Sequence, residues 1–464
     1  MTVDAGGIII VQPYGAFIQN NDSGTAINNG TIQVAKNTAP LNNWYEYTYW
    51  SSPVSNALVG VSLSDSDSDR RFIFNASQFN DQYAETGNDN NLVFGLQDDI
   101  DDEGDDWQQV NGATIMKPGV GYAATHSEIA YVNPGANYRY TFEGGTFNNG
   151  VISVPVNRND ITTADFNWNF IGNPYPSAVD IDAFMTQNMY NAATNQSGTL
   201  EGAIYFWSQN TNYSPTANGN QALNFDTTDY AAHNGTGGTQ GGDGLTPNDF
   251  IPSGQAFFVS FSDSYPTNSG TVVFNNAMRS LGLSPDNSQF FKNSNSKKSS
   301  TPVANKLWVN LTSDNGVFNQ ILIGYVNGAT NSNDGAYYDA RKIVAPKAFA
   351  ALYSTIENSN KKFAIQGKAP NSLNEDEIIN LGFTTHIDVA TLYTLSVAQL
   401  QGDFLTNNPV YLKDNKLNIT HDLSASDYTF TSEVGEFNSR FEIVFNANAL
   451  STENAVLDSK ALRI

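Results

Sequence analysis

A set of short motifs occurs twice in the same order, and this duplication restricts the possible folds more than any other feature of the sequence. The first copy lies within residues 49–154 and the second within residues 168–279. The corresponding segments are 49–55 and 168–177, 71–74 and 203–207, 116–123 and 251–259, and 145–150 and 270–276. Each is a run of aromatic and β-branched residues beside glycine, proline or asparagine, which is typical of β-strands that end in turns. The sequence therefore predicts two related β-modules.

The repeat also predicts that the two modules share one strand connectivity. Three sets of positions are expected to be equivalent: Pro53 with Pro174, Tyr122 with Phe257 or Phe258, and Trp50 with Trp168. A different strand order in the two halves would mean that the match reflects only turn chemistry common to many β-proteins.

Composition restricts the class of protein. The 464 residues are enough for about two to four domains with cores of their own. The formal net charge of −24 would repel nucleic acid and anionic membrane surfaces, so neither is an expected partner. Because the chain has no cysteine, disulfides, thiolate zinc sites and cysteine nucleophiles are excluded. Aromatic residues make up 12% of the chain, which indicates a folded protein and not a disordered acidic one.

We predict an all-β, multidomain fold in which tandem, related β-sandwich-like modules precede a C-terminal β-sandwich. Residues 1–38 hold short strands between glycine and asparagine turns, which fits either the end of a β-solenoid or a β-meander. The predicted bounds are 39–160 for module 1, 161–290 for module 2, 291–304 for a Lys/Ser/Asn-rich linker, 305–446 for the sandwich and 447–464 for a tail. The one helix predicted within the modules spans residues 177–185. We expect neither a signal peptide at the start nor a transmembrane helix.

Clustered carboxylates are the strongest candidates for a ligand site. Asp65, Asp67 and Asp69 alternate in one segment, and seven acidic residues occupy the nine positions 98–106. Hard oxygen ligands on a loop suit Ca²⁺, so the candidate calcium ligands are Asp65, Asp67, Asp69, Asp99, Asp101 and Glu103. Neither segment matches the EF-hand pattern, because the position that needs a bidentate Glu holds Val110 or Ala76. The alternative is a pair of solvated acidic loops.

A second oxygen-rich segment lies between residues 226 and 249, where the alternative is an ordinary long surface loop. Its four carboxylates are Asp226, Asp229, Asp243 and Asp249.

No catalytic pattern is recognisable. Asp180 and Asp182 lie two positions apart on the predicted helix, so their side chains are expected to point in different directions and not to flank one glycosidic bond. The signatures of serine esterases, zinc proteases and phosphate loops are missing. We therefore predict that the chain is not an enzyme, and that the motif at residues 172–176 is architectural because its two prolines fix the backbone.

An aromatic series at residues 44–50 has two interpretations. Alternation along a strand places Tyr45, Tyr47 and Tyr49 on one face and Trp50 on the other. The rings either pack in a core or, if one face is open, stack on sugars.

Eight motifs, in order along nearly the whole chain, carry a resemblance to a known family. The most specific is Trp-Asn-Phe-Ile-Gly-Asn-Pro-Tyr-Pro-Ser-Ala at residues 168–178. The others lie at 49–54, 117–122, 204–207, 254–259, 318–320, 364–367 and 421–423. Together they resemble the C-terminal portion of large surface proteins exported by the type IX secretion system of Bacteroidota. In that family a sorting domain follows a segment similar to residues 459–464, so the tail is expected to lead into a sorting domain that this chain lacks.

The resemblance implies a secreted or cell-surface protein, often an adhesin linked to gliding or attachment. We therefore expect a non-enzymatic structural or adhesive module with a stalk or attachment role, located outside the cell. The expected partners are glycans or surface polymers and, through the missing domain, the secretion machinery. The alternative function is a carbohydrate-binding region of a larger secreted glycan-processing enzyme.

Overall fold

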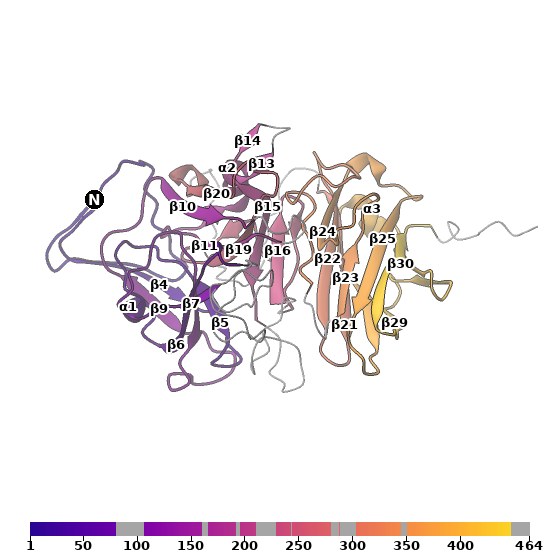
Figure 1. The fold of residues 1–464 in the computed structure, drawn as a ribbon, viewed down its shortest axis with the longest axis horizontal. Coiled ribbons are helices and arrows are strands. Elements are labelled where there is room, and N and C mark those ends of the chain that lie inside the picture. The colour runs from indigo at the N-terminus through magenta and orange to yellow at the C-terminus, as the bar shows by residue number, and fades with distance from the viewer. Residues whose placement is uncertain are drawn as a thin grey trace, which may run out of the picture. The chain divides into compact units, whose positions relative to one another are not determined.

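Most of the regular secondary structure is β-strand, as predicted (Figure 1). The computed structural model describes residues 1–79, 106–159, 166–191, 195–209, 229–242, 244–279, 287, 303–344 and 350–446. The chain divides into two compact units. Unit 1 contains Met1–Lys298 together with Gly335–Ile343, and unit 2 contains Ser299–Asp334 and Val344–Ile464. No helix within the described ranges has the length and apolar character needed to cross a membrane.

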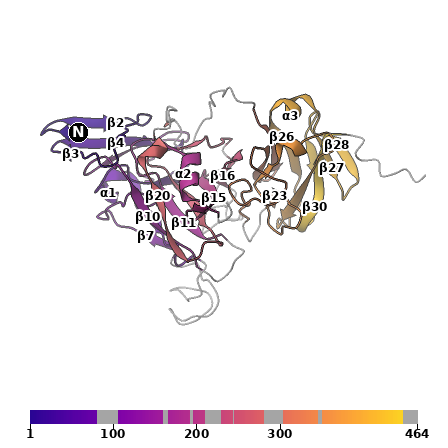
Figure 2. The same cartoon turned by 90° about the horizontal axis from the view of Figure 1, so that it is seen from above.

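The N-terminal segment forms a short parallel arrangement. Strand β1 (Thr2–Val3) pairs in parallel with β3 (Ile27–Asn28), and β2 (Ile8–Val11) pairs in parallel with β4 (Thr31–Asn37) (Figure 2). A meander would make neighbouring strands antiparallel, so this alternative does not fit. The two pairs amount to one coil, and a repeating solenoid is not confirmed.

Module 1 consists of two sheets around one core. Strand β4 also pairs with β9 (Arg139–Glu143) in the first sheet. The second sheet has the order β5-β8-β6-β7 and is formed by β5 (Tyr47–Trp50), β8 (Tyr122–His126), β6 (Ser66–Phe74) and β7 (Trp107–Gln109). A four-residue helix, α1 (Val59–Ser62), follows β5. Trp50 and Phe142 are among the buried side chains between the sheets.

Module 2 repeats this plan. Strand β10 (Ile152–Asn157) pairs with β20 (Ser269–Phe274). The larger sheet has the order β11-β19-β15-β16-β17, formed by β11 (Trp168–Gly172), β19 (Ala256–Phe261), β15 (Leu200–Trp207), β16 (Tyr230–Asn234) and β17 (Gly237–Gly238). The smaller elements are β12 (Val179–Asp180) paired with β18 (Phe250–Ile251), β13 (Tyr190–Asn191) paired with β14 (Gln196–Ser197), the helix α2 (Ile181–Asn188) and the 3₁₀ turn η4 (Asn276–Arg279).

The common connectivity confirms the predicted repeat. In both modules the first strand of the larger sheet pairs with the last, which pairs with the second. Trp50 is opposite Tyr122, and Ile171 is opposite Phe257, so Tyr122 is equivalent to Phe257 and Pro53 to Pro174.

The predicted equivalence of Trp50 and Trp168 is wrong. Trp168 is opposite Ser260, as Tyr47 is opposite Thr125, so Trp168 is equivalent to Tyr47. Trp50 lies three positions after Tyr47, the residue equivalent to Trp168. The two indoles therefore lie on opposite faces of their sheets, because a shift by an odd number of residues moves a side chain to the other face of a strand.

Strand pairing also gives module boundaries that differ from the predicted 38/39 and 160/161. Strand β4 belongs to the sheets of module 1, and β10 occupies the same place in module 2. Asn-Asn-Gly precedes both strands, at residues 28–30 and 148–150. In this alignment Lys36 corresponds to Val156, and both are buried.

The motif at residues 172–176 joins the parts of unit 1. The Asn173 side-chain amide donates to the carbonyls of Ser177, Ile251 and Pro252 at 2.8–3.0 Å. The buried Tyr175 hydroxyl donates to the Gly150 carbonyl at 2.6 Å. Backbone contacts link the motif to the N-terminal segment, through Phe17 N to Pro176 O, at 2.8 Å. These bonds fit the predicted architectural role of the motif.

Helix α2 begins four residues later than predicted. Asp180 caps it by accepting a hydrogen bond from the Ala183 amide at 2.8 Å. Because residues 177–180 lead into the β12–β18 pair, the helix cannot include them.

Unit 2 is the predicted C-terminal β-sandwich. One sheet has the order β24-β22-β21-β26-β29 and the other β23-β25-β30-β27-β28. Their strands are β21 (Asn305–Ser313), β22 (Phe318–Tyr325), β23 (Ala350–Ser354), β24 (Ile365–Lys368), β25 (Ile378–Thr385), β26 (Tyr393–Gln401), β27 (Tyr411–Asp414), β28 (Ile419–Asp422), β29 (Tyr428–Phe430) and β30 (Gly435–Val444), with a 3₁₀ turn η5 (Pro370–Ser372) and a short helix α3 (Asp403–Asn407). The chain between β22 and β23 departs from the prediction, since residues 335–343 belong to unit 1. The predicted linker, except residues 303–304, and the tail lie outside the described residues.

Candidate functional site

The described half of the predicted calcium site does not bring its carboxylates together on one ion. Asp65 lies beside His126 and Tyr140, whereas Asp67 lies beside Arg71. The Asp69 amide donates to the Asp67 carboxylate at 2.9 Å. Asp99, Asp101 and Glu103 lie outside the described residues. Across the parts of the chain that the structure describes, no group of three or more His, Cys, Asp or Glu side chains could hold a metal ion.

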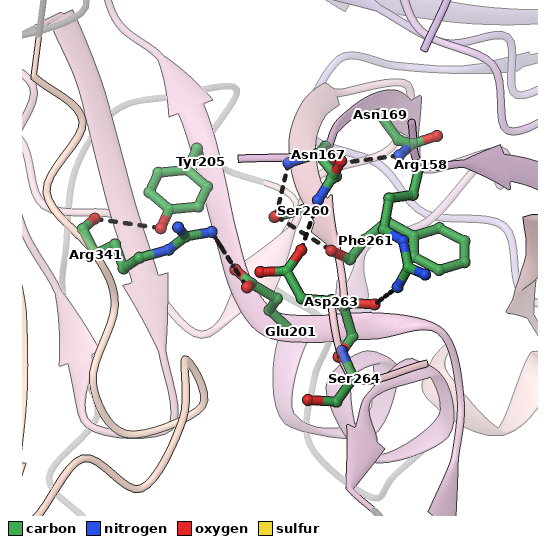
Figure 3. Close-up of polar contacts among 11 residues, drawn as sticks. Arg158, Asn167, Asn169, Glu201, Tyr205, Ser260, Phe261, Asp263, Ser264 and Arg341 are labelled. Atoms are coloured by element: carbon green, nitrogen blue, oxygen red, sulfur yellow. Dashed lines mark hydrogen bonds and ion pairs between the residues drawn. The ribbon is translucent and has the colours of Figure 1, made fainter. Parts of the chain in front are cut away.

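The most distinctive contacts of unit 1 involve a returning segment, Gly335–Ile343, which we call the strap. Both carboxylate oxygens of Glu201, on β15, accept hydrogen bonds from the Arg341 guanidinium at 3.1 Å (Figure 3). Both side chains are largely buried, and the guanidinium lies 4.1 Å from the centre of the Phe166 ring. Burial is the largest single influence and opposes the charge of Arg341, but Glu201, Tyr205 and Asp263 together outweigh it and raise the pKa of Arg341. The pair therefore holds the strap through opposite charges that are largely shielded from water.

Tyr337 anchors the other end of the strap. Its ring lies against Gly235, and its backbone nitrogen and Cβ lie against Gly202, so a Cβ at either glycine would crowd Tyr337. The Gly235 amide donates to the Tyr337 carbonyl at 2.9 Å, and the Asn234 side chain donates to the Ala336 carbonyl at 2.9 Å. Two glycines thus form a notch for an aromatic side chain.

A group of acidic side chains surrounds the Tyr337 end. The Tyr337 hydroxyl donates to Asp182 at 3.4 Å, and the buried His233 ring lies 3.3 Å from Asp249. Burial raises the pKa of Asp180, and burial also raises the pKa of Asp182 although His233 opposes that shift. Nδ1 of His233 has no hydrogen-bond partner among the described residues.

The sequence identified Asp180, Asp182 and Asp249 as separate features, and the structure groups them electrostatically with His233 and the strap. Asp229 is buried directly before β16 and acts electrostatically on Tyr49 and Tyr230. Asp226 and Asp243 lie outside the described residues. Sequence reasoning missed Glu201, Tyr337 and Arg341, because Arg341 and Glu201 are 140 residues apart and carry no motif.

Figure 3 also shows a separate group of polar contacts within module 2, around Asn167 and Asp263. The Asn167 side chain donates to the Asp263 carboxylate at 2.8 Å. The Arg158 guanidinium donates to the carbonyls of Ser262 and Tyr265. These bonds saturate polar groups of the scaffold and contain no nucleophile with an adjacent base.

Within β5 the aromatic series has the alternation that the sequence predicts, whereas Tyr45 precedes the strand. Trp50 is buried in the module 1 core beside Tyr140 and Phe142. Tyr49 lies on the other face of its sheet, against aromatic rings of module 2 at centroid distances of 4.7–6.5 Å: Phe170, Trp207, Tyr230 and Phe258. The outer faces of the two larger sheets therefore bury each other, and core packing explains Tyr49. Tyr47, Phe72 and Trp107 are half-buried at the margin of this aromatic layer.

Comparison with known proteins gives a family and no activity. The model of a family described as "Domain of unknown function (DUF8693)" matches residues 1–445. No curated protein and no solved structure matches the chain.

Proposed function

The chain belongs to the DUF8693 family, and we propose that it is a non-enzymatic structural or adhesive module, with a stalk or attachment role, in a secreted or cell-surface protein. One observation carries the structural part of this proposal. The chain passes between its two units three times, after residues 298, 334 and 343. A force that separates the units must therefore release the docked strap as well as stretch the connecting segment.

The energetics of the strap support this role. The Arg341–Glu201 pair is largely buried, and both of its hydrogen bonds come from one guanidinium nitrogen. Such a charge-assisted contact is strong away from water, and its loss leaves a charge buried without a partner. The aromatic layer between the modules resists separation in the same way, because its rings would become exposed to water. The extracellular location, the secretion machinery as a partner, and glycans or surface polymers as ligands rest on the sequence resemblance and the acidic composition.

Stretching single full-length chains tests the structural role. We expect Arg341→Ala to lower the force of the first rupture, since the strap then detaches without breaking an ion pair. Arg139→Ala is a matched control, because this exposed arginine on β9 lies outside the strap contacts and bonds to Gln12. Equal first-rupture forces in the wild type and Arg341→Ala would contradict the proposal. So would hydrolysis of a glycan or peptide that is lost on replacing one Asp or Glu without unfolding.

The alternative, a carbohydrate-binding region of a larger glycan-processing enzyme, is favoured by the half-buried rings of Tyr47, Phe72 and Trp107. Stacking on a sugar needs a ring face that water can reach. Glycan titrations followed by tryptophan fluorescence, with Phe72→Ala as the variant, test this alternative. Saturable binding that Phe72→Ala abolishes would favour it over the structural role.

Calcium remains a proposal for the acidic segments. Ions that bind only the folded state raise its stability by mass action, so we expect a higher melting temperature in millimolar Ca²⁺ than in EDTA. Identical transitions in calorimetry would remove calcium from the proposal.

A further inference from the structure

We propose that the strap groove of unit 1 also accepts the strap of a second copy of this chain, so that the protein associates by strap exchange. The groove is defined by Asp182, Glu201, Gly202, Asn234 and Gly235, with the Phe166 ring at one end. The inference goes beyond the proposed function, because it concerns assembly and does not depend on a stalk or adhesive role.

The strap carries its recognition features within nine consecutive residues. Arg341 supplies the ion pair and Tyr337 supplies the ring for the glycine notch. Backbone carbonyls of the strap accept bonds from the groove: Tyr337 from the Gly235 amide, Ala336 from Asn234 and Tyr338 from the Thr236 hydroxyl, each at 2.9 Å. None of these contacts uses a residue of the C-terminal sandwich. The recognition of the strap by the groove therefore depends on the residues of the strap itself.

The groove is selective for the residue types that the strap presents. The Gly235 position cannot hold a side chain while Tyr337 is docked. The Tyr205 hydroxyl donates to the Arg341 carbonyl at 3.3 Å, which fixes the backbone of the strap beside its charged side chain. In this sequence an aromatic residue followed four positions later by an arginine occurs only at Tyr337 and Arg341, so another copy of the chain supplies the same pattern.

Strap exchange replaces each contact within one chain by the identical contact between two chains, so the free energies of the contacts cancel. The balance then depends on the effective concentration that the covalent connection gives to the strap, compared with the concentration of other copies. Docking within one chain is favoured in dilute solution. Exchange is favoured where copies are crowded or where the strap has been transiently released.

The lack of cysteine allows a direct test. Full-length Asn234→Cys and Ala336→Cys chains are purified separately and mixed over a range of concentrations after brief exposure to mild denaturant. A short bismaleimide then links thiols that are close together. The Asn234 side chain contacts the Ala336 carbonyl, so a product of twice the chain mass marks an exchanged strap. Asn234→Cys mixed with Asn360→Cys, an exposed position outside the strap, is the matched control.

We expect the Asn234→Cys and Ala336→Cys mixture to give about tenfold more linked dimer than the control, increasing with concentration. Adding Arg341→Ala to the Ala336→Cys chain should lower the yield. The double variant Asn234→Cys/Ala336→Cys, at high dilution, should cross-link internally. Internal linking without a dimer yield above the control at any concentration would overturn the proposal. Failure of the double variant to link internally would overturn the docked strap itself.

Discussion

Lys36 gives the sharpest test of the packing described above. Its side chain is 1% exposed, within the core of module 1, and its Nζ donates to the Pro13 carbonyl at 2.8 Å. Burial lowers the pKa of Lys36 from 10.5 to about 7. At about 1.4 kcal/mol for each pKa unit, this difference corresponds to a cost of about 5 kcal/mol for keeping the ammonium charged in the fold. The equivalent residue in module 2 is the apolar Val156, so the fold itself does not require a charge here.

The sign of the pH dependence follows from proton binding. Below pH 7 both the folded and the unfolded states bind the Lys36 proton, and the folded state bears the full cost. Between pH 7 and 10.5 the unfolded state binds more protons, so the contribution of Lys36 to stability improves as the pH rises. Above pH 10.5 the cost is gone.

We therefore expect Lys36→Met to stabilise unit 1 at pH 6. The gain of about 5 kcal/mol is reduced by about 1–3 kcal/mol, because the Pro13 carbonyl loses its donor. At pH 10 the advantage should fall by about 4 kcal/mol relative to pH 6, and the variant should be no more stable than the wild type.

Denaturant unfolding followed by tryptophan fluorescence at pH 6 and pH 10 measures the difference, provided that the dependence on denaturant concentration is the same in both proteins. Lys117→Met, at an exposed position, is the control and should show no such change. If the free energies of unfolding of the wild type and Lys36→Met differ by the same amount at pH 6 and pH 10, burial does not lower the pKa of Lys36.

Three further predictions concern other parts of the molecule. Arg440 and Asp414 form a fully buried ion pair at 3.1 Å in unit 2, so Asp414→Ala should destabilise that unit by about 3–5 kcal/mol in urea unfolding, and a loss below about 1 kcal/mol would contradict the pairing. Asp180→Asn should stabilise unit 1 at pH 7, because asparagine keeps the helix cap and removes a carboxylate whose pKa is raised by burial. The folded state holds the Asp180 proton more tightly, so this advantage should vanish at a pH low enough to protonate Asp180 in both states. Calorimetry at both pH values measures the effect, and an equal effect at the two pH values would contradict the prediction. Tyr175→Phe should cost about 1–2 kcal/mol in thermal unfolding, because the buried Gly150 carbonyl loses a donor at 2.6 Å, whereas no change would show that water replaces the hydroxyl.

Features that depend on local patterns could be predicted from the amino-acid sequence. Strand-length runs of aromatic and β-branched residues between turn residues indicated an all-β fold, and a motif repeated in order indicated two modules with one connectivity. The alternation of Tyr49 and Trp50 predicted that they face opposite sides, since the side-chain period of a strand is two residues. Such features can be predicted because each is encoded within a few consecutive residues.

Other features depend on contacts between distant parts of the chain and become visible in the folded protein. The Asn-Asn-Gly positions at 28–30 and 148–150 mark module boundaries only once β4 and β10 are seen in equivalent pairs. Nothing near Arg341 in the sequence indicates that it packs in unit 1 against Glu201, and no local pattern predicts that the Tyr337 ring lies against Gly235. The buried charge of Lys36 and the raised pKa of Asp180 likewise depend on which segments cover them. Contacts between distant residues and the removal of water from a charge are set by how the sheets pack, and that information is spread over the whole chain.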